Sequence, residues 1–110
     1  MDLSLLMSAK RFAVVGASAD SRKVGHQILS NLHSNKELTV YPINLKGGTI
    51  LDLKVYGHLY ETPEPPEVVI IAVPVLATEV VIDECIRIGT SAVVLISSGF
   101  AEAGDQGKVL

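Results

Sequence analysis

The sequence predicts an α/β fold in three layers, with helices on both faces of a doubly wound parallel sheet. Four short apolar runs rich in β-branched residues, at 11–16, 38–43, 68–73 and 92–97, alternate with longer polar or amphipathic segments. The last two runs are apolar almost without interruption, which is typical of strands buried on both faces of a sheet. The first run ends in a glycine loop that leads into an amphipathic segment, as in a nucleotide-binding strand, loop and helix.

The first expected helix follows that loop. Apolar residues recur every four positions from 24 to 32, which predicts a helix with one apolar stripe. We expect Asp20 or Ser21 to cap its first turn.

The segment 45–66 interrupts the alternation of strands and helices. Gly47 and Gly48 mark a turn, and residues 53–56 have the composition of a short extended piece. Prolines at positions 63, 65 and 66 exclude a helix just before the third run.

A second helix is expected at 76–88, where Gly89 ends it. Right-handed crossovers then predict the strand order 3-2-1-4, with the runs numbered along the chain. Residues 101–110 have the pattern of a loop that enters a helix. We therefore expect the chain to be the N-terminal part of a longer protein.

Composition limits the function classes. A chain of 110 residues, 48% hydrophobic and 19% charged, suits a single domain over residues 1–110. A net charge of −3 argues against nucleic-acid binding, and no apolar run approaches the ~20 residues that span a bilayer. Cys85 is the only cysteine, which excludes a disulfide framework and favours the cytoplasm. We interpret Cys85 as a buried core thiol.

Open α/β sheets bind ligands at the carboxyl ends of their strands. Gly16 at the end of the first run lets the backbone approach an anion, and the following helix offers unpaired N–H groups. Ser18 and Ser21 stand where the dinucleotide fingerprint G-x-G-x-x-G has glycines. After the second run come Asn44 and Lys46, where an NAD site places an acid for the ribose hydroxyl. A cation there suits a phosphate, so NADP or CoA is favoured over NAD.

The strand ends otherwise carry hydroxyls, amides and cations. The Ser18 hydroxyl is placed to donate to a phosphate. The candidate ligand contacts from this reasoning are Gly16, Ala17, Ser18, Arg22, Lys23, Asn44, Lys46, Pro74, Ser97 and Ser98.

We find no residues arranged for catalysis. The strand ends hold no nucleophile–base pair and no paired carboxylates, and His26, His33 and His58 lack metal-ligand spacing. We interpret these histidines as helix-surface or loop residues, and Asp83 and Glu84 as the solvated face of the second helix. The sequence therefore predicts a binding module without chemistry of its own.

Five motifs, in order along nearly the whole chain, resemble one family. They are FAVVGAS at 12–18, KVG at 23–25, VYPIN at 40–44 with Lys46, IAVP at 71–74 and SSGF at 97–100. The family is the Rossmann-like CoA-binding domain of NDP-forming acyl-CoA synthetases, which is related to the succinyl-CoA ligase α subunit.

The resemblance implies coenzyme A as the ligand. It places CoA phosphates at Ser18, Ala19, Asp20 and Ser21, a further contact at Lys46, and the rest of the site at Val73, Pro74, Ile96, Ser97 and Ser98. No residue here matches the family's phosphorylated histidine, and its ATP-grasp domain is absent. The resemblance thus implies further domains or subunits of an ADP- or other NDP-forming ligase as partners.

Two alternatives stay open. One is an NADP-binding Rossmann module of a reductase or redox sensor, with Lys46 on the 2′-phosphate. The other is a stand-alone CoA-binding protein without catalysis. If run 92–97 is a free sheet edge, copies of the chain could also pair there as a homo-oligomer.

Overall fold

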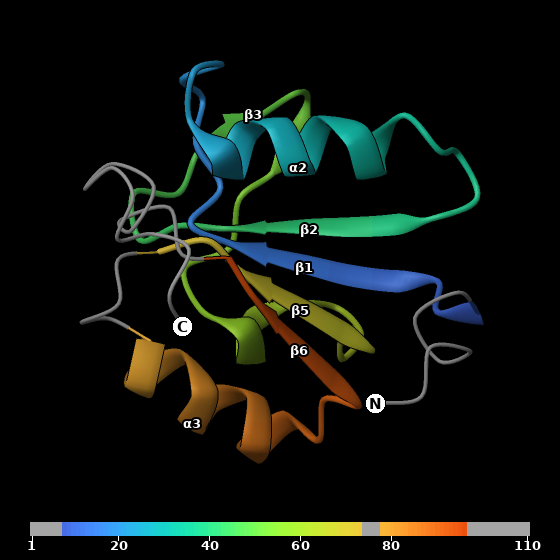
Figure 1. Cartoon of the computed structure of the whole chain (residues 1–110), viewed down its shortest axis with the longest axis vertical. Coiled ribbons are helices and arrows are strands. Elements are labelled where there is room, and N and C mark those ends of the chain that lie inside the picture. The colour runs from blue at the N-terminus through green and yellow to red at the C-terminus, as the bar shows by residue number, and fades with distance from the viewer. Residues whose placement is uncertain (1–7, 74–77, 97–110) are drawn as a thin grey trace.

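The computed structural model describes residues 8–73 and 78–96 of the chain. Figure 1 shows a central sheet between two helical layers. The elements, in order, are β1 (Arg11–Val15), α2 (Val24–His33), β2 (Thr39–Ile43), β3 (Thr49–Ile50), β4 (Leu53–Lys54), the 3-10 helix η1 (Leu59–Glu61), β5 (Val68–Ile71), α3 (Thr78–Ile88) and β6 (Ala92–Leu95).

The main sheet contains four strands in the order β2-β1-β5-β6, and all of its neighbours are parallel. Helix α2 covers one face, and α3 covers the other (Figure 1). The predicted three-layer, doubly wound, Rossmann-like class is therefore confirmed.

The predicted strand order 3-2-1-4 is wrong. The third run, β5, pairs with β1, where Phe12 lies beside Val68 and Val15 beside Ile71. The fourth run, β6, pairs with β5. With the runs numbered along the chain, the observed order is 2-1-3-4.

The strand order differs from the prediction because of the path that the chain takes between β2 and β5. That connection carries η1, and its buried Leu59 packs in the cluster that contains Cys85 of α3. The connection therefore crosses on the face opposite α2. A right-handed crossover on the opposite face must travel in the opposite direction along the sheet, past β1. The predicted order 3-2-1-4 would need this connection to cross on the α2 face.

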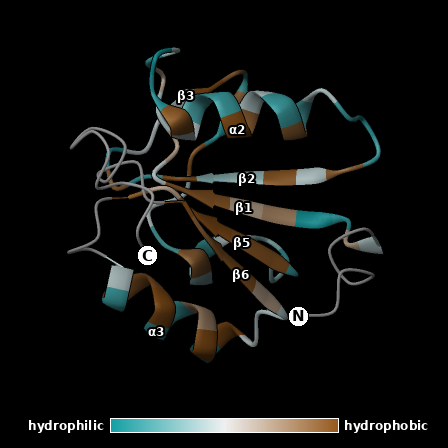
Figure 2. Ribbon diagram, in the orientation of Figure 1, coloured by the Kyte–Doolittle hydropathy of each residue, from teal (hydrophilic) through white to brown (hydrophobic). Residues whose placement is uncertain are grey.

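The core is divided by the sheet. Neighbouring residues of β1 point to opposite faces, so Val14 packs with Leu29 of α2 whereas Val15 packs with Cys85 of α3. Figure 2 shows mainly apolar strands, and a helix α2 that is polar on its outer side and apolar toward the sheet. Cys85 is buried as predicted, and its burial raises the pKa of the thiol to about 11.

The segment 45–66 forms a small antiparallel hairpin, β3-β4, and then returns to the sheet. The Tyr56 amide donates to Pro42 O at 2.9 Å, and the Tyr56 carbonyl accepts from the Asn44 amide at 2.9 Å. The predicted extended piece is thus confirmed at β4 and at the Tyr56 bridge beside β2.

The predicted end of α3 is confirmed, but the predicted cap of α2 is not. Gly89 follows α3 with φ +75°, which confirms the predicted C-terminal glycine. The N-cap of α2 is Lys23, without a side-chain cap, so the predicted cap by Asp20 or Ser21 is wrong. Among residues 8–73 and 78–96, no helix is long and apolar enough to cross a membrane.

Candidate functional site

Gly16 lies where three strands meet. Its amide donates to Ile43 O of β2 at 3.1 Å, and its φ of +92° is a conformation that side chains disfavour. A Cβ on Gly16 would lie 2.5 Å from Ala72 O, just after β5. After β1 the chain crosses to β2 on one side of β1. The later strands β5 and β6 lie on the other side of β1. Gly16 therefore lies at the switch point, where open α/β sheets bind their ligands.

Helix α2 begins directly against this turn. A Cβ on Gly25 would overlap the carbonyl oxygen of Gly16, so glycine at 25 allows the close approach of helix and loop. The N-terminus of α2 has a partial positive charge, and its first amides lack helical partners. The loop 16–23 and this helix end together form a surface suited to an anion.

Two side chains hold consecutive carbonyl groups of the loop. Asn44 Nδ2 donates to Ala17 O at 2.7 Å, and His26 Nδ1 lies 2.8 Å from Ser18 O. A carbonyl only accepts, so His26 carries a proton on Nδ1. His26 lies on helix α2, as expected, but it is partly buried there and shapes the loop.

The Ser18 side chain forms a hydrogen bond within the loop itself. Its Oγ accepts a bond from the Asp20 amide at 3.0 Å. A hydroxyl that accepts one bond can still donate its own proton. The predicted donation from Ser18 to a phosphate is compatible with this geometry.

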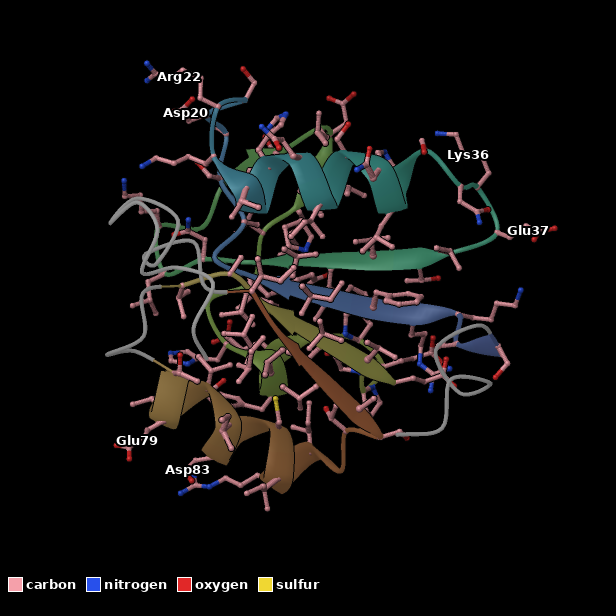
Figure 3. All side chains as sticks on the ribbon, in the orientation of Figure 1. Asp20, Arg22, Lys36, Glu37, Glu79 and Asp83 are labelled. Carbon is pink, nitrogen blue, oxygen red and sulfur yellow. The ribbon has the colours of Figure 1, made fainter. Side chains whose placement is uncertain are left out.

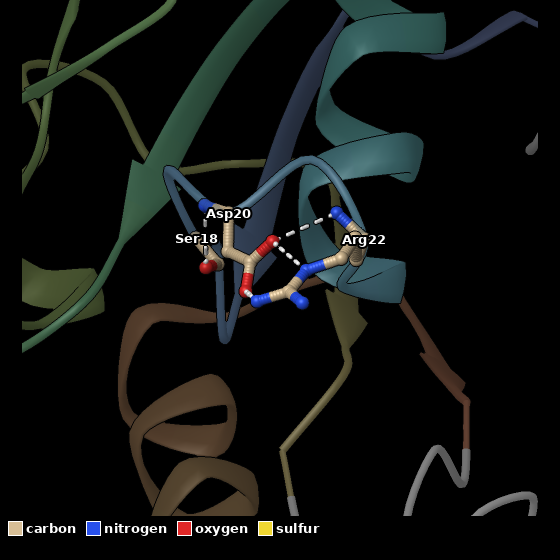
Figure 4. A network of polar contacts seen from close by, with 3 residues as sticks. All are labelled: Ser18, Asp20 and Arg22. Carbon is tan, nitrogen blue, oxygen red and sulfur yellow. Dashed lines mark hydrogen bonds and ion pairs between the residues drawn. The ribbon is translucent and has the colours of Figure 1, made fainter.

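Arg22 is engaged with Asp20 in the loop (Figure 4). The Arg22 Nε and Nη2 atoms donate to the two Asp20 carboxylate oxygens at 3.1 and 3.0 Å, and the Arg22 amide donates to Oδ1 at 2.9 Å. These bonds from Arg22 lower the pKa of Asp20 below its usual value. The Arg22 side chain is 88% exposed, so a phosphate could reach it.

Two lysines add positive charge beside the loop. Lys23 precedes α2 directly, and the Lys46 amide donates to Asn44 Oδ1 at 2.8 Å. Asn44 thus links Lys46 to the loop through its bond with Ala17. Within the described part of the chain, neither lysine forms an ion pair.

The structure brings most predicted contacts to the carboxyl edge of the sheet. Ala17 is fully buried, backbone included, so it presents no accessible atom to a ligand in this structure, whereas Ala19 and Ser21 are exposed. Val73 lies beside Gly16, and the Ile96 amide donates to Ile71 O at 2.9 Å, at the end of β6. Pro74, Ser97 and Ser98 lie outside the described residues.

A cavity of about 410 Å³ opens at the same edge, on the α3 face. Its walls come from the ends of β1 and β2, from η1 and from α3. The lining residues are Val15, Gly16, Ile43, Asn44, Leu45, Gly57, His58, Leu59, Val73, Val80, Val81 and Glu84.

The sequence reasoning missed two of these lining residues, His58 and Glu84. Glu84 is not on a solvated face: its side chain is 15% exposed, accepts from the Leu59 amide at 3.0 Å and lies 3.0 Å from His58 Nδ1. The signal was present, because Glu84 follows Val81 by three residues, on the stripe that faces the sheet. Asp83 is exposed, as expected, and points away from the sheet (Figure 3).

The chain is similar to known proteins over nearly its whole length. The family model described as the CoA binding domain matches residues 10–106. The chain is 40% identical to the α subunit of ADP-forming acetate–CoA ligase I of Pyrococcus furiosus, over 98% of this chain and 24% of that protein. It is 38% identical to ADP-forming acetate–CoA ligase II of Archaeoglobus fulgidus, over 96% of this chain and 16% of that protein.

Solved structures are similar along the same span. A dinucleotide-forming acetyl-coenzyme A synthetase of Ca. Korarchaeum cryptofilum, in complex with phosphate and ADP, is 41% identical with a TM-score of 0.83. The match covers 94% of this chain and 23% of that one. A conserved hypothetical protein of Pyrococcus furiosus is 28% identical with a TM-score of 0.71, over 91% of this chain and 89% of that one. The chain thus spans about a quarter or less of the ligases it matches.

Proposed function

The chain belongs to the CoA-binding domain family found in ADP-forming acyl-CoA synthetases, and from that premise we propose that it binds CoA across the carboxyl ends of β1, β2 and β5. The loop 16–23 and the N-terminus of α2 receive the phosphates. Lys23 and Lys46 supply the positive charge, and Asn44 holds the loop in place. Val73 and Ile96 flank the same edge of the sheet.

One observation carries this proposal. The close contact of Gly16 and Gly25 brings the loop and the N-terminus of α2 together at the switch point, and Lys46 stands at the end of β2 where an NAD site needs a carboxylate. A ligand with several phosphate groups would be bound both by the loop and by Lys46. CoA has three phosphate groups, and the ligases with which this chain aligns are named for CoA.

We further propose that residues 1–110 form one domain of a longer ADP-forming acyl-CoA synthetase. In that protein this chain holds CoA, while a phosphohistidine domain and an ATP-grasp domain carry out the chemistry. The cytoplasm is the proposed compartment, since CoA is a metabolite of that compartment and Cys85 is a free thiol.

A second candidate is a stand-alone CoA-binding protein. One observation favours it: the Pyrococcus furiosus hypothetical protein is matched over 89% of its own length, so this fold also exists in a chain of similar size. Among the described residues β6 pairs with β5 alone, and Leu95 at its end is 52% exposed. Self-association of a stand-alone chain would use this edge.

The site is tested by titrating CoA into the isotope-labelled chain and following its backbone amide resonances. We expect the largest shifts in the loop 16–23 and at 44–46. The turn at 34–38, at the opposite end of α2, serves as an internal control. Shifts concentrated at that turn, or spread evenly over the chain, would refute a site at the carboxyl edge.

A further inference from the structure

We infer that the cavity on the α3 face holds the adenine base of the ligand and that His58, oriented by Glu84, recognises the edge of that base. This inference rests on the proposed function, because it names the part of CoA that enters the cavity. The comparisons assign no role to His58 or Glu84.

The cavity suits an uncharged group better than a phosphate. Its lining is mainly aliphatic, and Glu84 is the one ionisable acid among the residues that line it. A carboxylate and a low-polarity wall both repel an anion. Gly16 of the phosphate-binding loop lines the cavity, and so does Asn44, which is bonded to that loop at Ala17 O. A ligand with phosphates on the loop therefore extends an uncharged group into the cavity.

The mouth of the cavity favours a flat apolar group. Leu45 is 80% exposed and Val80 is 64% exposed, and they reach the opening from the β2 end and from α3. Large exposed aliphatic side chains around a concave site indicate a surface that a ligand covers. The two faces of a purine ring would bury both of them.

The polar group inside is fixed in one orientation. Glu84 Oε2 accepts from His58 Nδ1 at 3.0 Å, and the Tyr60 ring stacks on the imidazole with centroids 4.9 Å apart and planes 10° apart. Glu84 Oε1 also accepts from the Leu59 amide, so both carboxylate oxygens are engaged. With its proton on Nδ1, a neutral His58 presents Nε2 as an acceptor.

An acceptor in this place suits adenine. The exocyclic amino group of adenine donates, whereas guanine has a carbonyl oxygen at the same ring position. Pantetheine is the other uncharged part of CoA, but its thiol must leave this domain to react, because the described residues offer no nucleophile–base pair at the strand ends. The adenine end of CoA does not react, so it is the end that enters the cavity.

The test measures calorimetric affinities of the 110-residue chain for CoA, for adenosine and guanosine 3′,5′-bisphosphates, and for 4′-phosphopantetheine. We expect the adenosine compound to bind more tightly than the guanosine compound. His58→Phe keeps a flat ring but removes the acceptor, so it should weaken the adenosine compound by about three- to tenfold and abolish the preference over guanosine. A merely structural role of His58 would weaken both bases equally.

A second pair of variants tests the cavity itself. Val80→Phe narrows the mouth and should weaken CoA and adenosine 3′,5′-bisphosphate by about tenfold while 4′-phosphopantetheine is unaffected. Ile86→Phe is the matched control, since Ile86 is 73% exposed on the same helix and does not line the cavity. It should leave all affinities unchanged.

The outcomes separate the two proposals. If the chain binds CoA but Val80→Phe weakens phosphopantetheine instead, or His58→Phe leaves base preference intact, this inference is overturned and the proposed function stands. If the folded wild-type chain binds neither CoA nor the adenosine compound, both are overturned.

Discussion

Gly25 packs its Cα against the carbonyl group of Gly16, so that any Cβ at position 25 would overlap the Gly16 oxygen. This contact joins the start of α2 to the turn after β1. It places the positive end of the helix at the switch point of the sheet. The candidate site therefore depends on a backbone contact that only glycine permits.

Gly25→Ala should lower the free energy of unfolding by about 1–3 kcal/mol, because the new methyl group meets rigid backbone. Urea unfolding measures the change. Gly57→Ala is the control, since its Cβ would meet only Glu61 Oε1, the tip of a side chain, at 3.3 Å. Equal effects of the two substitutions would show that the close approach at Gly25 is not required.

Lys46→Ala should weaken CoA binding by about tenfold to a hundredfold, which corresponds to about 1.5–3 kcal/mol for a lost charge-assisted bond. Lys36→Ala removes the same charge from an exposed turn at the far end of α2 (Figure 3) and should have little effect. Titration calorimetry at low salt measures both. An unchanged dissociation constant for Lys46→Ala would remove Lys46 from the site.

Asp20→Asn should strengthen CoA binding by about two- to fivefold, because it frees Arg22 and removes a negative charge from the phosphate loop. Asp83→Asn removes the same charge from the outer surface of α3 and serves as the matched control. Weaker binding by Asp20→Asn alone would indicate that the Asp20–Arg22 pair shapes the loop for the ligand.

Glu67 connects the starts of β1 and β5, since its Oε1 accepts from the Lys10 and Arg11 amides at 2.8 and 3.0 Å. These bonds lower the pKa of Glu67 below its ordinary value of 4.5. The ionised form therefore stabilises the fold above about pH 4.5, and this stabilisation is lost as the pH falls through the lowered pKa.

Glu67→Gln should accordingly lower the urea midpoint at pH 7 and flatten its decline in acid. Glu37→Gln, in the exposed turn after α2, should behave like the wild type. The urea midpoint measured from pH 7 to pH 3 distinguishes the two variants. A Glu67→Gln curve parallel to that of the wild type would contradict the pKa assignment.

The local patterns predicted the strands and helices well, because apolar periodicity and the glycines at 16 and 89 act over a few residues. Strand order depended instead on which face the connection 44–67 crosses. That choice is made by the burial of Leu59 against α3, a contact between distant residues in a segment without a long helix. The His58–Glu84 pair spans the same gap, so no local pattern could join them.

The central claim is that the carboxyl edge of this sheet binds CoA in preference to a dinucleotide. Calorimetric titration of the purified chain with CoA, NADP and NAD tests it most directly. The account predicts saturable one-to-one binding that is tightest for CoA, weaker for NADP and weakest for NAD. Tighter binding of NADP than of CoA, or no heat of binding with CoA from a folded chain, would contradict it.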